Sequence, residues 1–385
     1  MGLIKDIYSP AFYDTFAGIL VDVLPEFEKA TYISLIFNED FKEMEWKERM
    51  KHTTRVLHKF MPEDFGKATK LIEKIITKLR TKSFGEDNLA FIFFADYVET
   101  YGLDDLETSV KAFEFITQFI SCEFAVRPFI LKYSDVMLNY MVIWSGHESA
   151  KVRRLASEGS RPRLPWAMAI PELKKNPAPI LPILDNLKTD TSESVRRSVA
   201  NSLNDIAKDH PLIVLEIASK WKGISKETDA IIKHGSRTLL KQGHADILKH
   251  YGLESHNIAV SGFEILTPDV SIGEALDFTF FVENNGTDTQ TIRLEYAVYY
   301  FKSNGQLSKK VFKISERIFQ PGEKIKVNRK QSFRLITTRK FYAGEHKLSV
   351  IVNGEEKVTG IFNLLDQHAK DQFTNPVKNN LNNFD

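Results

Sequence analysis

Arginines and a carboxylate stand close together in one segment of this sequence, directly before a proline-rich turn. Arg154 and Glu158 are one helical turn apart, so a helix would place both side chains on the same face. The chain then reads Gly159-Ser-Arg-Pro-Arg-Leu-Pro-Trp166, whose two prolines prevent the helix from continuing. A stiff turn with two guanidinium groups and an indole could bind phosphate bidentately and stack on a base or a cation.

A second carboxylate with arginine neighbours is predicted 47 residues further on. At 100° per residue, a helix over 195–208 gathers its apolar side chains on one side and places Asp205 on the opposite, polar side with Arg197. Simpler alternatives exist for these residues. Arg154 and Glu158 could form an ordinary salt bridge on a solvated helix, and Trp166 could belong to a core.

A repeat of 43 residues positions both acids. Val152-Arg-Arg-Leu-Ala156 recurs as Val195-Arg-Arg-Ser-Val199, and apolar residues at three- and four-residue spacings predict further amphipathic helices over 71–79, 89–97 and 110–120. Repeats of about 40 to 47 residues are typical of HEAT-type helix pairs, which stack into a curved solenoid with a concave face. The alternative is that two surface helices share a short motif by chance.

Alternation with a period of two replaces the helical spacing after about residue 255. Phe278, Phe280 and Val282 show it, and turn sequences such as Asn353-Gly354 separate the runs. About seven short strands in an immunoglobulin-like sandwich without a disulfide are expected. The predicted architecture is therefore an all-α HEAT-like repeat solenoid over 1–253, a C-terminal immunoglobulin-like β-sandwich over 257–365 and a disordered tail over 366–385.

The near-neutral net charge of +1 conceals strong regional differences. Residues 1–145 hold 17 basic and 23 acidic side chains, whereas residues 146–250 hold 18 and 12. In the β part, residues 251–301 hold 1 basic and 8 acidic side chains, and residues 302–347 hold 13 and 3. Two basic segments could bind a polyphosphate backbone, because each neutralised phosphate releases condensed counterions. A solvated charged face is the alternative.

Several classes of protein are excluded or disfavoured by what the sequence lacks. Cys122 is the single cysteine, so there is no disulfide framework and no multi-cysteine metal site, and a reducing cytoplasm fits best. With no histidine close to it in the sequence, Cys122 reads as a buried apolar residue. No secretory signal, membrane span, GxSxG, Walker A, HExxH or CxxC motif is found. We expect no metal and no cofactor.

The same segments resemble a known family. Ala150-Lys-Val-Arg-Arg-Leu-Ala-Ser-Glu-Gly-Ser-Arg-Pro-Arg-Leu-Pro-Trp-Ala167 and the segment 194–211 closely resemble the signature of AlkC, a DNA alkylation repair glycosylase of the HEAT-like repeat superfamily that also includes AlkD. The similarity extends to Asp96-Tyr-Val-Glu99 and Glu123-Phe-Ala-Val-Arg-Pro-Phe129, and covers essentially all of residues 1–250. A subset of that family carries a C-terminal immunoglobulin-like domain.

The resemblance implies a monofunctional DNA glycosylase that removes cationic N-alkylated bases such as 3-methyladenine, 3-methylcytosine and 1-methyladenine without flipping the base. It implies that three active-site carboxylates lie close to an aromatic residue that contacts the damaged nucleotide, with arginines nearby that contact the DNA backbone. Transferred by motif position, the carboxylates are Glu123, Glu158 and Asp205, the aromatic residue is Trp166, and the arginines are Arg154, Arg161, Arg163 and Arg197.

Those residue types suit the implied chemistry. A base alkylated on a ring nitrogen leaves as a neutral molecule and needs no general acid. A nearby carboxylate can stabilise the oxocarbenium character of the sugar and orient the attacking water. The expected partner is double-stranded DNA with alkylated bases, bound by a monomer in the bacterial cytoplasm without a membrane or an obligate protein partner. A non-catalytic HEAT scaffold that binds nucleic acid or protein remains the alternative.

Overall fold

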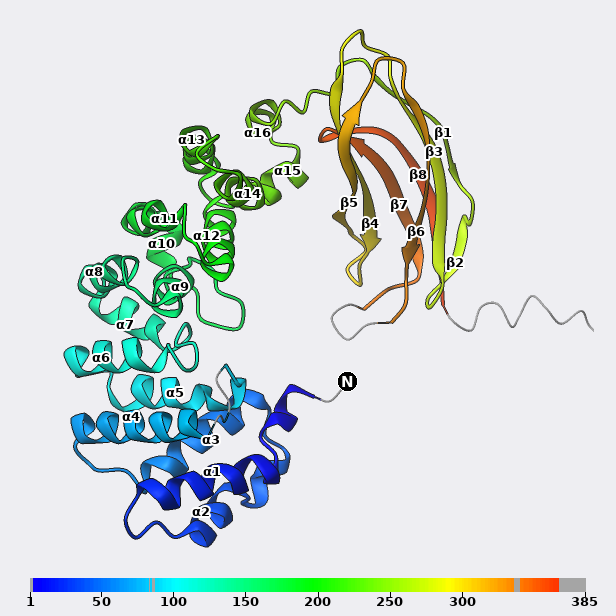
Figure 1. Ribbon diagram of the computed structural model, residues 1–385. Helices are drawn as coiled ribbons and strands as arrows, with labels where there is room; N and C mark the ends of the chain where they lie inside the picture. The colour runs from blue at the N-terminus through cyan, green and yellow to red at the C-terminus, as the bar shows by residue number, and fades with distance from the viewer. Residues whose placement is uncertain (1–2, 83, 85–86, 336–339, 367–385) are drawn as a thin grey trace, which may run out of the picture. The chain divides into compact units, whose positions relative to one another are not determined.

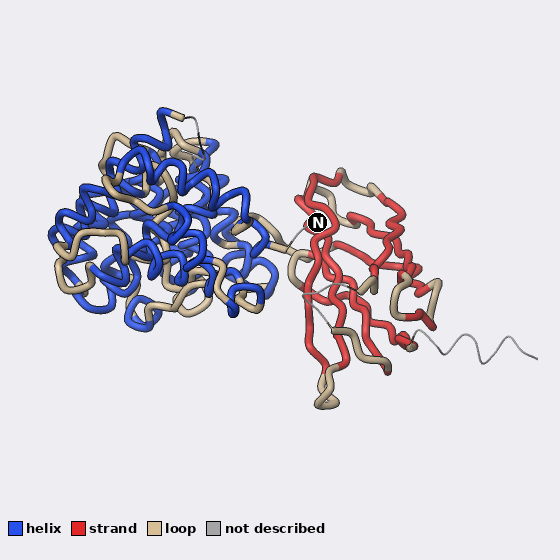
Figure 2. Tube along the Cα trace, turned by 90° about the horizontal axis from the view of Figure 1, so that it is seen from below, coloured by secondary structure: helices blue, strands red, loops and turns tan. Residues whose placement is uncertain are grey.

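The computed structural model describes residues 3–82, 84, 87–335 and 340–366. It divides into two compact units, residues 1–236 and 237–385. Figure 2 shows that the strands belong to the second unit. The sequence-based boundary at 253–257 marks the change from helices to strands, whereas the division into units falls earlier. Most of the predicted tail, residues 367–385, lies outside the described residues.

The first unit stacks its helices in two layers (Figure 1). We call one the site layer; it contains α3 (Trp46–His58), α5 (Phe93–Tyr101), α9 (Ala150–Gly159), α12 (Glu193–Ile206) and α14 (Lys226–Gly235). The back layer contains α4 (Phe65–Thr81), α6 (Leu106–Ile116), α8 (Asp135–Trp144), α11 (Leu181–Leu187) and α13 (Pro211–Trp221). The remaining elements are α1 (Pro10–Val23), α2 (Lys29–Ile36), α7 (Val126–Tyr133), α10 (Pro171–Lys175) and the 3-10 helices Ile4–Ile7, Glu39–Lys42, Leu89–Ile92 and Ala178–Ile180.

Local sequence signals set the helix boundaries. The Asp64 side chain accepts a hydrogen bond from the backbone nitrogen of Lys67 at 2.7 Å and so caps α4. The expected helix over 110–120 ends earlier, at Ile116. The expected helix over 89–97 starts as a 3-10 turn and becomes α-helical only at Phe93. The predicted helical segments are therefore present, with shifted ends.

The 43-residue repeat reflects one structural device used twice. Arg153 donates to the carbonyls of residues 147 and 148 at 2.9 and 2.7 Å, and Arg196 donates to those of residues 190 and 191 at 2.8 Å each. In both repeats the first arginine of Val-Arg-Arg thus ties down the loop that precedes its helix. Residues Val152, Leu155, Val195, Val199 and Leu203 are fully buried, in agreement with the predicted apolar faces.

The second unit begins with α15 (Arg237–Gln242) and α16 (Ala245–His250) and continues as two packed sheets. One sheet has the order β1-β3-β6, and the other β2-β8-β7-β4-β5. Neighbouring strands are antiparallel except for the short parallel pair β2–β8. Their bounds are β1 (Ile258–Ile265), β2 (Asp269–Ser271), β3 (Ala275–Asn284), β4 (Gln290–Phe301), β5 (Leu307–Phe319), β6 (Lys324–Ser332), β7 (Gly344–Val352) and β8 (Glu355–Leu365).

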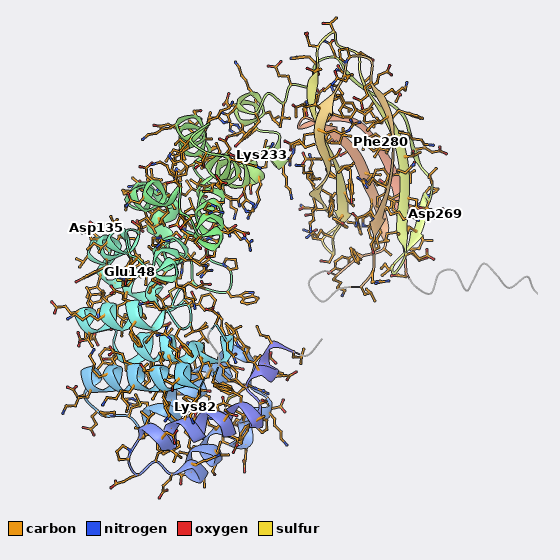
Figure 3. All side chains as sticks on the ribbon, viewed as in Figure 1. Lys82, Asp135, Glu148, Lys233, Asp269 and Phe280 are labelled. Carbon is orange, nitrogen blue, oxygen red and sulfur yellow. The ribbon has the colours of Figure 1, made fainter. Side chains whose placement is uncertain are left out.

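Side chains from both sheets fill the space between them (Figure 3). Phe280 of β3 is fully buried there, as the alternation predicted. Strand β4 departs from simple alternation, because Arg293 and Glu295 on its other face are buried as well. They pair with each other at 2.6 Å, and Arg293 also reaches Glu316 at 3.1 Å, so neighbouring charges on β4 and β5 compensate one another.

Candidate active site

The turn that follows α9 is held in a tight and unusual conformation. A Cβ added to Gly159 would lie 2.7 Å from Cγ2 of Val126, so glycine permits α9 to end close against α7. Trp166 has φ of +65°, a left-handed conformation that bulky residues rarely adopt. Its indole is 66% exposed. The turn therefore presents an aromatic ring at the surface at a conformational cost.

A cavity of about 270 Å³ lies beside this turn. Four of the residues selected from the sequence line it: Glu123, Glu158, Arg161 and Trp166. Trp46 of α3 forms another wall, with its ring centroid 6.1 Å from that of Trp166. The remaining lining residues are mainly apolar: Leu89, Ile92, Ile120, Ser121, Phe124, Leu164 and Pro165. Two carboxylates thus face the same space as an exposed indole.

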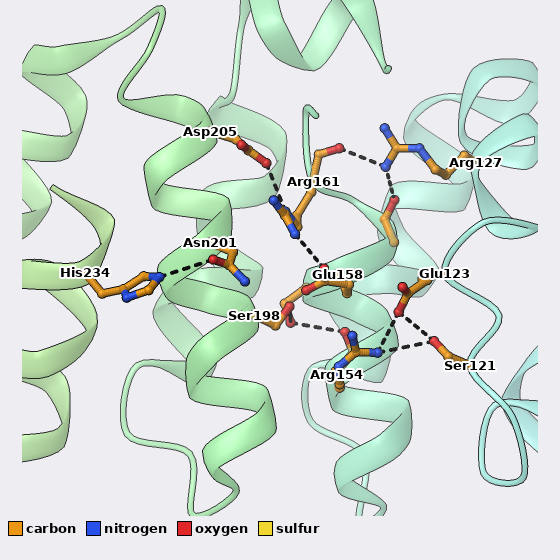
Figure 4. Close-up of polar contacts among 12 residues, drawn as sticks. Ser121, Glu123, Arg127, Arg154, Glu158, Arg161, Ser198, Asn201, Asp205 and His234 are labelled. Atoms are coloured by element: carbon orange, nitrogen blue, oxygen red, sulfur yellow. Dashed lines mark hydrogen bonds and ion pairs between the residues drawn. The ribbon is translucent and has the colours of Figure 1, made fainter. Parts of the chain in front are cut away.

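Arg161 connects the two predicted acids of the repeat (Figure 4). Its Nη1 donates to Glu158 Oε1 at 2.6 Å, and its Nε donates to Asp205 Oδ2 at 2.9 Å. All three side chains are buried. Burial disfavours the charged form of Arg161, but the charges of Glu158 and Asp205 outweigh it and raise the pKa of the guanidinium. Asp205 is therefore not on a solvated polar face, because Arg161 from the turn covers it.

The third acid has a separate arginine partner. Glu123 Oε2 accepts hydrogen bonds from Arg154 Nη1 at 2.6 Å and from Ser121 Oγ at 2.8 Å. The simple Arg154–Glu158 salt bridge considered as an alternative is not formed among the described residues, since Arg154 pairs with Glu123 and Glu158 with Arg161. The arginines consequently join acids from different helices and loops.

The three carboxylates differ in which oxygens remain available. Both oxygens of Asp205 are engaged, because Lys208 Nζ donates to Oδ1 at 3.0 Å while Arg161 occupies Oδ2. Glu158 Oε2 and Glu123 Oε1 accept no hydrogen bond from any described residue. Because Glu158 and Glu123 also line the cavity, they are the acids placed to meet a ligand there.

Arg127 is a functional candidate that the sequence analysis did not select. Its guanidinium is fully buried and donates to the carbonyls of Gly159, Arg161 and Met168 at 2.9, 2.8 and 2.6 Å. These three carbonyls bracket the turn that carries Trp166. Burial, together with the positive charge of Arg161, lowers the pKa of Arg127 to about 10, so it stays charged at neutral pH. Its place inside the segment 123–129 was the available sequence signal.

Arg163 and Arg197, predicted as backbone contacts, lie in different surroundings. Arg163 Nη2 donates to Asp209 Oδ1 at 2.7 Å, and its Nη1 reaches the Asp205 carbonyl at 3.2 Å. Arg197 is exposed, pairs with Glu193 and lines another cavity of about 250 Å³ between α12 and α14. The structure thus attaches Arg163 to the Asp205 end of the site, whereas Arg197 lies outside the Trp166 cavity.

Helix α3 supplies two site residues that no sequence motif marked. Trp46 is buried, and its indole Nε1 has no hydrogen-bond partner among the described residues. Lys47 donates to the Trp166 carbonyl, and its Nζ lies 5.7 Å from the centre of the Phe124 ring. Both residues are more than 110 positions away from Trp166 in the sequence, so only the fold brings them to the site.

Comparison with solved structures shows how this arrangement is related to known proteins. The chain resembles the Pseudomonas fluorescens alkylpurine DNA glycosylase AlkC, solved bound to DNA containing an abasic site analogue, with a TM-score of 0.88, 33% identity and coverage of 94% of this chain and 100% of that one. The chain belongs to the AlkC family. Its AlkC-type helical unit and its immunoglobulin-like unit are both as expected from the sequence.

Two further similarities accompany the AlkC match. The uncharacterised protein YhaZ of Bacillus subtilis is 42% identical over 358 residues, which cover 93% of this chain and 98% of YhaZ. Residues 259–366 match the model of the YhaZ C-terminal immunoglobulin-like domain. The first similarity extends over both units of the chain, and the second covers the β domain alone.

The described residues show neither a membrane-spanning helix nor a cluster of metal ligands. None of the helices in the described residues combines the length and apolar character that a membrane crossing needs. In the same part of the chain, no cluster of three or more His, Cys, Asp or Glu side chains could hold a metal ion. Cys122 is fully buried, and burial raises the pKa of its thiol far above the usual range.

Proposed function

We propose that this protein is a monofunctional DNA glycosylase of base excision repair. It hydrolyses the N-glycosidic bond of cationic N-alkylated bases, namely 3-methyladenine, 3-methylcytosine and 1-methyladenine, and leaves an abasic site. One observation carries the proposal: two acids with an available oxygen, Glu123 and Glu158, line one cavity with the exposed indole of Trp166. The similarity to AlkC, an alkylpurine DNA glycosylase solved with DNA, supports it.

The hydrogen bonds of the three carboxylates suggest a role in catalysis for each of them. Glu158 and Glu123 stabilise the positive charge that develops on the sugar as the bond breaks, and one of them orients the attacking water. Asp205 acts through Arg161, because both of its oxygens are already engaged. Asp205 is in this scheme a positioning residue, which refines the three equivalent acids implied by the sequence resemblance.

Selectivity follows from the charge of the damaged base. A cationic base leaves as a neutral molecule, so the site needs no general acid. The π face of Trp166 favours a cation over a neutral base. Because this indole is 66% exposed, it can contact a nucleotide that stays in the duplex, in keeping with excision without base flipping. The protein acts as a monomer on double-stranded DNA in the bacterial cytoplasm.

The contacts of Arg161 argue against the DNA-backbone role that the sequence resemblance implied for it. A guanidinium buried between two carboxylates is poorly placed to meet a DNA phosphate. We therefore assign Arg161 to the alignment of Glu158 and Asp205. Arg163, which is half-buried, and the exposed Arg197 keep the proposed backbone role. The scaffold alternative is disfavoured, because the cavity acids and Trp166 lie together.

Base release from methylated DNA tests the proposal. Glu158→Gln should slow release by about 100- to 1000-fold, the usual effect of removing one transition-state contact, while most DNA affinity remains. Asp205→Asn should also lower the rate strongly by loosening Arg161. Glu172→Gln is the control, since Glu172 is an exposed acid paired with Lys175. Near-native release by both site variants would refute the assignment.

A further inference from the structure

Three cationic side chains follow one face of α3 away from the Trp166 cavity. Lys47, Lys51 and Arg55 are spaced four residues apart, so they fall on nearly the same side of the helix, and all three are exposed. The stripe begins at the site, because Lys47 donates to the Trp166 carbonyl. Helix α3 belongs to the site layer with α5, α9 and α12 (Figure 1).

Ion pairs with the described residues do not neutralise these positive charges. Among the described residues, neither Lys51 nor Arg55 has a carboxylate partner within 4 Å. Asp96 and Glu99 of α5 are near enough to be felt electrostatically. Burial, reinforced by Asp96, raises the pKa of Glu99 to about 7, so Glu99 offsets only part of the positive charge at neutral pH.

We propose that Lys47, Lys51 and Arg55 form a phosphate-binding stripe that carries one DNA strand along α3 to the Trp166 cavity. The inference rests on the proposed function, which makes DNA the partner. Eight residues of helix span about 12 Å, the axial rise of about three to four nucleotides of one strand. Three cations at intervals of about 6 Å can therefore each meet a phosphate.

The lack of an ion-pair partner alone would not support this role. Lys67 and Lys74 on α4 are also exposed and form no ion pair with a described residue. They lie in the back layer, however, and no contact joins them to the Trp166 turn. Alignment with the cavity distinguishes the α3 stripe, and the α4 pair provides a control with the same number of charges removed.

The test compares two double variants of the full chain on unmethylated duplex DNA by fluorescence anisotropy between 50 and 300 mM KCl. Lys51→Ala with Arg55→Ala should weaken binding by about tenfold for each lost contact at 0.1 M salt. The slope of log K against log salt should become shallower by about 1.8, because each lost phosphate contact contributes about 0.9. Lys67→Ala with Lys74→Ala should leave both quantities near native values.

Equal slopes for the two double variants, or no DNA binding by the native chain, would overturn the stripe. Since the assay needs no base release, it separates the stripe from the chemistry. If the native chain released no methylated base but the α3 variant still lost salt dependence, the glycosylase proposal would fail and the stripe would stand. Unchanged thermal unfolding of both variants is expected, because all four side chains are exposed.

Discussion

The two buried guanidinium groups at the site, those of Arg161 and Arg127, have different binding partners. Arg161 contacts acids, whereas all hydrogen bonds of Arg127 to described residues go to backbone carbonyls of the Trp166 turn. The electrostatic influence of Glu123, Glu158 and Asp205 nevertheless favours the charge on Arg127. Arg127 thus shapes the turn and adds positive charge behind the acids, without reaching the cavity lining.

We expect Arg127→Lys to slow base release at saturating DNA by at least tenfold while DNA affinity changes little. A lysine cannot reproduce the three directed hydrogen bonds, so Trp166 and Arg161 would lose their alignment. Single-turnover rates and anisotropy binding curves would measure the two effects separately. A positioning role predicts a loss in rate at saturation.

Arg153→Lys is the matched control for Arg127→Lys. Arg153 also donates to two backbone carbonyls, but at the other end of α9, and pairs with Asp190 at 2.6 Å. Both variants should lower the unfolding temperature, and only Arg127→Lys should slow catalysis. Equal rate losses in the two would mean that Arg127 acts through general stability alone.

The site residues could be predicted from the sequence where they stand in contiguous motifs. They could not be predicted where their contacts join distant segments of the chain. Glu158 and Trp166 stand in one segment, so their proximity followed from the sequence. The pairing of Arg161 with Asp205 crosses 44 positions, and that of Lys47 with Trp166 crosses 119. Helical spacing describes neighbours within an element only, which is why Arg154 was paired with the wrong acid in the simple alternative.

At the scale of elements, strand β7 contains a buried group that titrates. His346 is fully buried among the rings of Tyr300, Phe333 and Phe362. Its Nδ1 lies 2.9 Å from the Gly344 carbonyl, so this nitrogen must carry the proton, and Nε2 has no partner among the described residues. Burial lowers the pKa of His346, because protonation would place a charge inside the sandwich.

The β unit should therefore become less stable as the pH falls. The unfolded His346 binds a proton below about pH 6.5, and the folded residue resists it, so stability is lost as the pH drops below that value. We expect the unfolding midpoint of the β unit to fall between pH 7.5 and 5 by calorimetry. In His346→Phe this part of the decline should disappear; an unchanged pH profile would exclude His346 as the cause.

Element types followed readily from the sequence, but their boundaries and the burial of β4 did not. Spacings of three and four residues predicted the helices, and alternation predicted the strands. Alternation alone cannot show that Arg293 and Glu295 are buried, because their charges are compensated by each other and by Glu316 on the neighbouring strand, which pairs with Arg293. Division of the chain before α15 was also invisible, since α15 and α16 retain helical spacing.

At the scale of the whole molecule, opposite charges that are separate in sequence partly cancel in the fold. The acidic strand β3 pairs with the basic strand β6, and Lys324 and Lys330 contact Glu283 and Asp277 at 2.9 and 3.0 Å. The excess over 302–347 therefore overstates the free positive charge. A cavity of about 220 Å³ is lined by Lys302, Lys309, Lys310, Lys340 and aromatic residues, and Lys309 is itself paired with Glu356.

We propose that this cavity, rather than the whole basic segment, helps the β unit to bind DNA. Lys302→Ala with Lys340→Ala should weaken DNA binding by about tenfold at low salt, because both lysines are exposed. Lys324→Ala with Lys330→Ala removes two lysines that are already paired and should have a much smaller effect. Anisotropy titrations would compare the DNA affinities of the two double variants. Equal losses of affinity would mean that the basic segment as a whole, and not this cavity, contributes to DNA binding.

The left-handed backbone of Trp166 sets a conflict between selection for stability and selection for activity. Glycine would adopt a φ of +65° without strain. Relief of that backbone strain in Trp166→Gly should stabilise the folded protein by about 1 kcal/mol. That replacement would also delete the exposed ring beside Glu158. Laboratory evolution for heat resistance alone would thus tend to lose the indole, whereas evolution under alkylation stress would retain it and accept the less stable turn.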